Sequence, residues 1–504
     1  MRRNITANIV GRAWGVTSVY IFVPLYLRFL GIEAYGMVGF YSTLLAVLAF
    51  ADMGFTASLN REMARLSAST GSLAEMRNLL RTYEVTYLCI SSAVAGIAWC
   101  LAPAIADHWL RAERLPHREI RAAVRLMGVA IAFQLPSGLY VGGLMGLQQQ
   151  VRANCLQIAW GVLRGTGAIL VLWLFSPTIV AFALWQSISN ALYAFFARLS
   201  LWHALAVSSA QSHPPFSWEP LRGTWRYAAG MLGMSLVSTL LTQTDKVTVS
   251  KMLPLQMLGY YSLAGAVASA PLMLAGPIAL AVFPRLTGLV ATGDRIGLAQ
   301  LYHKTCQLVS VAVIPAGLTI ALFAGELIAG WTGSAITAQR AGLVTSFLVG
   351  GQLMQAITVI PFYIALAHGD VRLNLKIGII SVLLITPLLI CLIMRFGVLG
   401  GGISWLAMNL CTLPPYMYFL HRRFLPGELR RWCLRSVGRP LLAALPAILL
   451  ARVFLPMPSS RLLAVGLIGI VWSLSAVAAA STMPEWRTGF IENVGKRLGL
   501  SYGV

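Results

Sequence analysis

The chain has 504 residues, of which 58% are hydrophobic and 11% are charged, and its mean hydropathy is +0.75. Because a soluble protein of this length carries about 25% charged residues, this composition excludes a single soluble core and predicts many membrane spans of about 20 apolar residues each. The net charge of +22 would suggest nucleic-acid binding in a soluble protein, but here the basic residues lie between apolar runs, so we expect no nucleic-acid partner.

The N-terminus, MRRNITANIVGRAWG, is basic and enters an apolar run, as a signal peptide does. Arg12 interrupts this run and no clear small-residue cleavage site follows, so we interpret it as an uncleaved first span. Apolar runs predict an all-α polytopic membrane protein with about fourteen spans. The predicted spans are 9–30, 35–59, 84–107, 123–146, 155–175, 179–203, 227–252, 258–282, 305–324, 341–366, 375–394, 398–420, 440–455 and 462–482.

The distribution of Lys and Arg predicts the orientation. With the N-terminus inside, 24 of the 38 basic residues lie on cytoplasmic segments and 11 on outside segments, and three fall within spans. Since basic loops stay in the cytoplasm, we expect a multi-pass protein of the cytoplasmic (inner) membrane with both termini inside. The longest segment between spans has about twenty residues, too few for a folded domain, so any activity takes place within or at the edge of the membrane.

Two internal correspondences predict a parallel repeat. The word Val-Arg-x-Asn occurs at 151–154 after span four, and again 220 positions later at 371–374 after span ten. Gly36, in the turn after span one, matches Gly259, 223 positions later, in the turn after span seven. Six spans separate the equivalent points, which preserves topology.

We expect two six-helix lobes and a terminal helix pair. The predicted boundaries are an N-lobe over 1–206, a cytoplasmic linker over 207–226, a C-lobe over 227–420, a helix pair over 421–482 and a cytoplasmic tail over 483–504.

Several stretches resemble Wzx-type polysaccharide flippases. FLGIEAYGMVGFY (29–41) is similar to that family's LG-x-E-x-YG turn, and Asp52-Met53-Gly54 to its D-x-G near the end of span two. TQTDKVTVSKM (242–252) and AVFPRLTGL (281–289) resemble its span-seven and span-eight sequences. The similarity covers most of the chain and is weakest after about residue 420.

The resemblance implies the multidrug/oligosaccharidyl-lipid/polysaccharide exporter superfamily, with two six-helix lobes around a central cavity. It implies movement of an undecaprenyl-diphosphate-linked oligosaccharide from the cytoplasmic to the periplasmic leaflet for O-antigen, capsule or exopolysaccharide synthesis. Expected partners are this lipid-linked sugar, membrane lipids, and a polysaccharide polymerase and chain-length protein. We expect no cofactor, and proton or sodium coupling stays open. The seven Cys and seven His lack metal-ligand spacing, so we expect no metal site.

Ionisable residues within spans are costly, so they usually face a cavity or a partner. Arg12 and Asp52 lie in the cytoplasmic halves of adjacent spans, where they could form a structural ion pair. Alternatively, Arg12 contacts a diphosphate and Asp52 binds a coupling ion. In span seven, Thr239, Gln243 and Lys246 form a polar stripe. Asp245, the second coupling-ion candidate, is an i,i+1 neighbour of Lys246 and is expected to face another direction.

Three arginines complete the candidate substrate site. Arg164 lies within span five, and Arg61 and Arg285 close spans two and eight at near-equivalent repeat positions. An arginine ring at the inner mouth would attract an anionic lipid diphosphate. Ordinary positive-inside anchoring explains Arg61 and Arg285 equally well.

Other functions remain open on the sequence alone. A cation-coupled multidrug exporter of the same superfamily would favour an acid-lined cavity, whereas bases outnumber acids within these spans. A lipid II flippase is a close relative. A membrane glycosyltransferase or polymerase would need an outer loop with catalytic acids or His, and the segment 108–122 offers only a short basic stretch. We therefore predict a transporter rather than an enzyme, with no catalytic residue.

Overall fold

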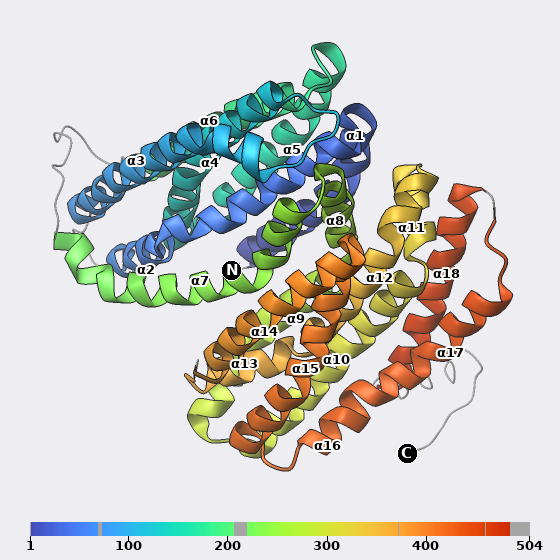
Figure 1. Ribbon diagram of the computed structural model, residues 1–504. Coiled ribbons are helices and arrows are strands. Elements are labelled where there is room, and N and C mark those ends of the chain that lie inside the picture. Colours follow the sequence, from blue (N-terminus) through green and yellow to red (C-terminus); the bar gives the residue numbers. More distant parts are fainter. Residues whose placement is uncertain (1, 69–72, 206–218, 371, 459, 484–504) are drawn as a thin grey trace, which may run out of the picture. The chain divides into compact units, whose positions relative to one another are not determined.

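The computed structural model describes the chain except residue 1, 69–72, 206–218, 371, 459 and 484–504. The side chains of 2–7, 9, 12, 16, 219–232 and 234 also lie outside the described part. Nearly all described residues are helical, as predicted (Figure 1). Apart from one isolated bridge between Arg111 and Pro254, they form no β-structure.

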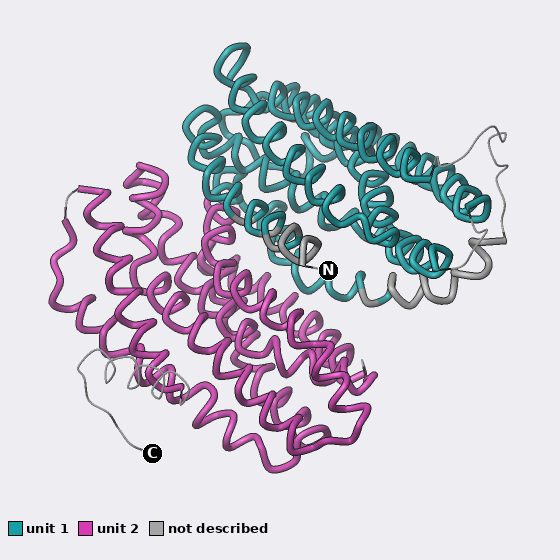
Figure 2. Tube along the Cα trace, turned by 180° about the vertical axis from the view of Figure 1, so that it is seen from behind, with its two compact units in different colours: residues 1–259 teal, residues 260–504 magenta. Residues whose placement is uncertain are grey.

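The chain divides into two compact units, residues 1–259 and 260–504 (Figure 2). Helix α8 (Leu255–Ala268) begins in unit 1 and continues in unit 2. The finer boundaries predicted from the sequence stay predictions. The predicted linker falls largely, and the predicted tail almost entirely, outside the described residues.

Unit 1 is built from long helices. They are α1 (Arg2–Leu48), the 3₁₀ turn η1 (Ala49–Asp52), α2 (Phe55–Ser67), α3 (Leu73–Ala104), the π-helical turn η2 (Ile105–Trp109), α4 (His117–Gly146), α5 (Gln150–Leu174), α6 (Ile179–Ala204) and α7 (Glu219–Met252). Its core lies between α2, α3, α4 and α6 and includes Tyr83, Tyr87 and Tyr193. On α5, Gly165 lies against the Phe22 ring of α1, so two helices that are distant in sequence pack closely.

Unit 2 continues in the same style. Its helices are α9 (Ala270–Thr292), α10 (Arg295–Leu322), α11 (Ala324–Thr332), α12 (Ala335–Ile357), α13 (Val359–Ala367), α14 (Arg372–Phe396), α15 (Val398–Phe424), α16 (Leu429–Arg431), the π-helical turn η3 (Trp432–Gly438), α17 (Arg439–Phe454) and α18 (Arg461–Ala480). The main core gathers α9, α10, α13, α15 and α17. A smaller core joins Phe323 to α17 and α18.

All fourteen predicted spans lie on these helices, and local breaks explain the differences in detail. Gly31 has φ 76°, which divides α1 into the first two spans. Predicted span eight crosses from α8 to α9 at Ser269, two residues before Pro271. Predicted span ten crosses from α12 to α13 at Thr358, three residues before Pro361. A proline ring clashes with the carbonyl four residues earlier, so these breaks fall where expected.

Eleven helical segments of the described chain are long and apolar enough to cross a membrane. They cover twelve of the predicted spans, and the other two are α7 and α15. Large apolar side chains stand exposed along the helices, for example Phe454 at 73% and Leu462 at 86%. Such surfaces require a hydrocarbon surrounding. The protein is therefore a multi-pass membrane protein.

Candidate functional site

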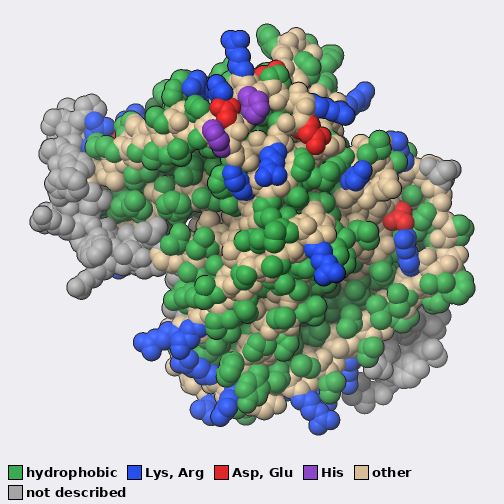
Figure 3. Space-filling model, viewed as in Figure 1, with side chains coloured by type: hydrophobic (Ala, Val, Ile, Leu, Met, Phe, Trp, Pro, Cys, Tyr) green, Lys and Arg blue, Asp and Glu red, His purple; other side chains and the backbone are tan. Residues whose placement is uncertain are grey.

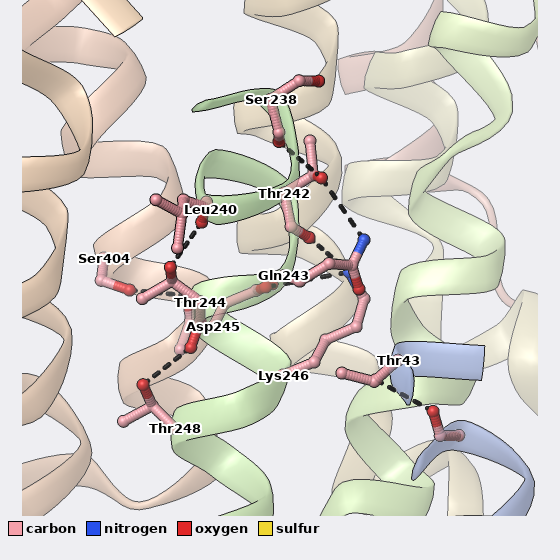
Figure 4. A network of polar contacts seen from close by, with 12 residues as sticks. Thr43, Ser238, Leu240, Thr242, Gln243, Thr244, Asp245, Lys246, Thr248 and Ser404 are labelled. Atoms are coloured by element: carbon pink, nitrogen blue, oxygen red, sulfur yellow. Dashed lines mark hydrogen bonds and ion pairs between the residues drawn. The ribbon is translucent and has the colours of Figure 1, made fainter. Parts of the chain in front are cut away.

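The polar stripe on α7 is the first candidate site. The stripe was predicted to consist of Thr239, Gln243 and Lys246, and the Lys246 side chain runs back towards the carbonyl of a further residue, Thr242 (Figure 4). Lys246 Nζ donates to that carbonyl oxygen at 2.8 Å, and the Gln243 amide lies 3.4 Å from the Thr242 hydroxyl. The Lys246 side chain remains 29% exposed in the structure. A cation held in a membrane helix can bind an anionic group of a substrate.

Asp245 departs from the sequence prediction. It was expected to lie away from Lys246, yet its carboxylate is 3.8 Å from the ammonium. The two side chains leave the helix on different sides and meet because the lysine is long (Figure 4). Asp245 is buried, with 6% of the residue exposed. Such a distance gives a weak ion pair, so the Lys246 charge is only partly neutralised.

Asp52 occupies a break in the second span. Met53 and Gly54, which follow it, both have positive φ (48° and 74°), so the chain leaves one helix and begins α2. The Asp52 carboxylate accepts hydrogen bonds from the hydroxyls of Thr56 and Tyr87. These hydroxyls lie 3.0 Å from each other. Asp52 thus lies in a small hydroxyl cluster that joins α2 to α3.

The predicted arginines lie in three different surroundings. The Arg164 guanidinium stacks over the Trp160 ring of α5, with 4.5 Å to the ring centroid, and is half-buried. Arg61 and Arg285 are exposed, which agrees with either anchoring or a basic mouth. The Arg12 side chain lies outside the described residues, so its predicted pairing with Asp52 remains untested.

The sequence did not predict two buried carboxylates of unit 1, and the first is Glu84. Glu84 of α3 is only 2% exposed in its side chain. It accepts from Arg198 Nε at 2.8 Å and from Trp202 Nε1 at 2.7 Å, both on α6, while Arg81 lies 3.4 Å away. The sequence does contain an indication of this pairing, because Arg81 precedes Glu84 by three positions and residues at this spacing are neighbours on a helix. Because the predicted third span begins at residue 84, Glu84 was expected at the membrane edge and not in the protein interior.

A second missed carboxylate lies in the turn after the first span. Glu33 is buried, with 8% exposed, and accepts from the backbone N–H groups of Glu113 at 2.7 Å and Arg114 at 3.1 Å. Lys251 Nζ donates to the His108 carbonyl at 2.7 Å. These hydrogen bonds join the segment between α3 and α4 to the turn after the first span and to the end of α7. Basic, acidic and His side chains gather over it (Figure 3).

A polar network in unit 2 has the order of a nucleophilic triad. His303 Nε2 lies 2.7 Å from the Glu428 carboxylate, and His303 Nδ1 lies 3.1 Å from Ser436 Oγ. Ser436, however, is 1% exposed, so its hydroxyl is not accessible to a substrate. The network joins α10 to α16 and η3 and acts structurally. Among the described residues, no group of three or more His, Cys, Asp or Glu could hold a metal ion.

Comparisons with known proteins give a consistent result. Residues 1–290 match the model of the family described as polysaccharide biosynthesis protein. A candidate O-antigen transporter of Shigella flexneri is 21% identical over 416 residues, covering 80% of this chain and 93% of the relative.

Two solved structures share the fold. The lipid II flippase MurJ in an inward closed conformation superposes with a TM-score of 0.73 at 12% identity, covering 97% of this chain and all of that one. An inward-facing multidrug resistance transporter of the MATE family, from the same exporter superfamily, gives a TM-score of 0.66 at 11% identity, covering 84% and 96%. The expected exporter fold is therefore confirmed.

Proposed function

Because the chain belongs to the polysaccharide biosynthesis protein family, we propose that it moves undecaprenyl-diphosphate-linked sugar repeat units from the cytoplasmic to the periplasmic leaflet by alternating access. The proposal includes a place in the bacterial inner membrane with both termini in the cytoplasm. A polysaccharide polymerase and a chain-length protein would act on the product. The flippase fold and the O-antigen transporter relative support this proposal.

The polar stripe on α7 is the observation that carries the proposal. A lipid diphosphate must leave water during translocation, and a fixed cation in the span lowers the cost of that step. Lys246 supplies the charge and Gln243 an amide that can bind phosphate or sugar oxygens. Arg164, stacked on Trp160, is a second cation within a span. Arg61 and Arg285 would collect the substrate at the cytoplasmic side.

Coupling to a proton or sodium gradient is part of the proposal. Asp52 and Asp245 are the acids that could carry it, since each lies within a span and one of them sits at a helix break. Protonation or cation binding at Asp52 would change its hydrogen bonds with Thr56 and Tyr87. A change at this break would alter the connection between α2 and α3.

Complementation tests the function directly. The chain is expressed in a bacterium that lacks its polysaccharide flippase but retains the other synthesis enzymes, and surface polysaccharide and drug resistance are both measured. We expect restored polysaccharide and no gain in resistance. Resistance without polysaccharide would show a multidrug exporter, and rescue of a lipid II flippase deletion alone would show that activity instead.

Two substitutions of Lys246 test its proposed role in binding the substrate. Lys246→Met removes the charge but keeps most of the apolar chain, whereas Lys246→Arg keeps the charge. We expect Met to reduce polysaccharide export by at least about tenfold, the effect of losing one charge-assisted hydrogen bond, and Arg to retain most of it. Equal export by both variants at equal membrane levels would refute a substrate role for this lysine.

A further inference from the structure

Unit 2 contains a pocket of about 560 Å³ that the proposed transport function does not use. It lies between the end of α10, α11, the first half of α12 and the last turn of α17. Small residues form much of its lining, including Ala324, Gly325, Ala338 and Gly342. A Cβ on Gly342 would lie 3.2 Å from the Gly325 Cα, so α11 and α12 cross closely and leave the space beside them open.

Two opposite charges flank this pocket. Glu326 in the first turn of α11 pairs with Arg452 in the last turn of α17, and their side chains remain 26% and 45% exposed. The Arg452 guanidinium also packs over the ring of the fully buried Phe323, with 5.4 Å to the centroid. A guanidinium has five N–H donors and a carboxylate has about four acceptor positions, so each group can bind a further partner.

Apart from Gln339 and Ser346, the remaining lining residues of the pocket are apolar or small, and the pocket is elongated. It follows α12 from Ala335 to Ser346, a rise of about 16 Å along the helix axis. Leu343 on its wall is 64% exposed, as a lipid-facing side chain is. Acidic and basic side chains stand side by side over α11 in an otherwise largely apolar face (Figure 3). Because Gly325 lies against Gly342, the charge pair at Glu326 lies level with Gly342 and Leu343 on α12, and the lining extends from there both towards Ala335 and towards Ser346.

We propose that this pocket binds a zwitterionic phospholipid whose head carries a primary ammonium and a phosphodiester. Arg452 would bind the phosphate in a bidentate manner, and Glu326 would accept from the ammonium N–H groups. One acyl chain would lie against the small residues of α11 and α12. The two charges select the lipid class. An anionic lipid such as phosphatidylglycerol has no cation to bind Glu326. Phosphatidylcholine has a quaternary ammonium, which has no N–H to donate.

Lipid titration with native mass spectrometry tests the proposal. The purified full chain in detergent is titrated with dioleoyl phosphatidylethanolamine, phosphatidylcholine or phosphatidylglycerol, and bound lipid is counted. We expect phosphatidylethanolamine to bind about tenfold more tightly than the other two, the value of one charge-assisted hydrogen bond. Glu326→Gln should remove this preference, and Arg452→Gln should weaken all three phospholipids.

Two control substitutions lie on α12, the helix that carries Leu343. Arg340→Gln removes an exposed arginine that does not line the pocket, and Ile336→Trp enlarges an exposed apolar residue outside it. Leu343→Trp should fill the groove and lower binding, whereas both controls should bind as the unaltered protein does. Equal affinity for the three lipids, or equal effects of Arg452→Gln and Arg340→Gln, would overturn the proposal.

Discussion

Gly36 and Gly259 occupy reciprocal positions in one helix crossing. A Cβ on Gly36 would lie 2.3 Å from the carbonyl oxygen of Leu255, and a Cβ on Gly259 would lie 2.3 Å from the carbonyl oxygen of Ile32. Both pairs belong to residues 1–259. Leu255 and Gly259 follow Ile32 and Gly36 at the same offset of 223 positions, so the two equivalent helix segments contact each other as a pseudo-twofold pair.

Substitution at this crossing should be costly at either glycine. Gly36→Ala and Gly259→Ala each place a methyl group against a backbone carbonyl that cannot move without its helix, and we expect a loss of about 1–3 kcal/mol in stability. The double variant should lose less than the sum, because one separation of the helices relieves both clashes. Thermal unfolding in detergent measures these effects.

The control for this crossing lies on the same helix. Gly265 of α8 has no atom within 4 Å of an added Cβ, so Gly265→Ala should leave the melting temperature unchanged or raise it slightly. A similar loss of stability at Gly265 and Gly259 would mean that helix flexibility, rather than close approach, explains the result.

The sequence predicted the equivalence of these glycines but not their contact. A matching offset shows that two segments share a local structure, whereas only packing determines whether they meet. The Val-Arg-x-Asn words show the same limit. Asn154 donates to the Gln150 carbonyl and to Asn8, and its equivalent Asn374 accepts from Tyr416 at 3.0 Å. Residues 152–154 and 372–374 lie in the first turns of α5 and α14, but the partners of the two Asn side chains come from unrelated parts of the chain.

Breaking the Glu84 cluster should destabilise unit 1. Glu84→Gln leaves Arg198 and Trp202 with a neutral acceptor in place of the carboxylate, and we expect a loss of about 1.5–3 kcal/mol, the contribution of a hydrogen bond to a charged group. Arg81→Gln should cost less, because its contact with Glu84 is 3.4 Å long, against 2.8 Å for Arg198. Chemical denaturation followed by Trp fluorescence compares the variants.

A double-mutant cycle separates the ion pair from simple packing. Arg198→Met in the Glu84→Gln background should add little further loss, since the pair is already broken. Fully additive losses would show that Glu84 and Arg198 act independently. Surface polysaccharide, measured at permissive temperature, should stay near normal if the cluster is structural.

Asp52 should respond differently from its hydroxyl partners. Asp52→Asn keeps the size and one acceptor oxygen but cannot ionise, so transport in vesicles should no longer depend on a proton or sodium gradient. Tyr87→Phe removes one donor at a cost of about 1 kcal/mol and should keep that dependence. Undiminished gradient dependence in Asp52→Asn would assign the coupling ion elsewhere, with Asp245→Asn as the next variant.

Charge within a predicted span selects Asp52, Arg164, Asp245 and Lys246 as candidates, because an ionisable group among apolar residues is conspicuous in the sequence. Their roles in transport stay predictions. The sequence predicts that the third span begins at Glu84, whereas α3 already runs from Leu73, so neighbouring helices bury a residue predicted to lie at the membrane edge. Burial near a helix end is determined by neighbouring helices, and one sequence alone does not place them.

Glu33 provides the most local test of the structure. Its carboxylate holds the backbone N–H groups of Glu113 and Arg114, so Glu33→Gln, with a single neutral acceptor oxygen, should free at least one of them. Since a hydrogen bond to a charged group contributes about 1.5–3 kcal/mol, amide exchange in 110–116 should accelerate roughly tenfold to a hundredfold. Exchange in α4 beyond residue 123 should stay unchanged, because those amides donate to carbonyls within their own helix. Unaltered exchange at 113 and 114 would contradict the role of this carboxylate, whereas faster exchange throughout α4 would show that it stabilises the whole helix.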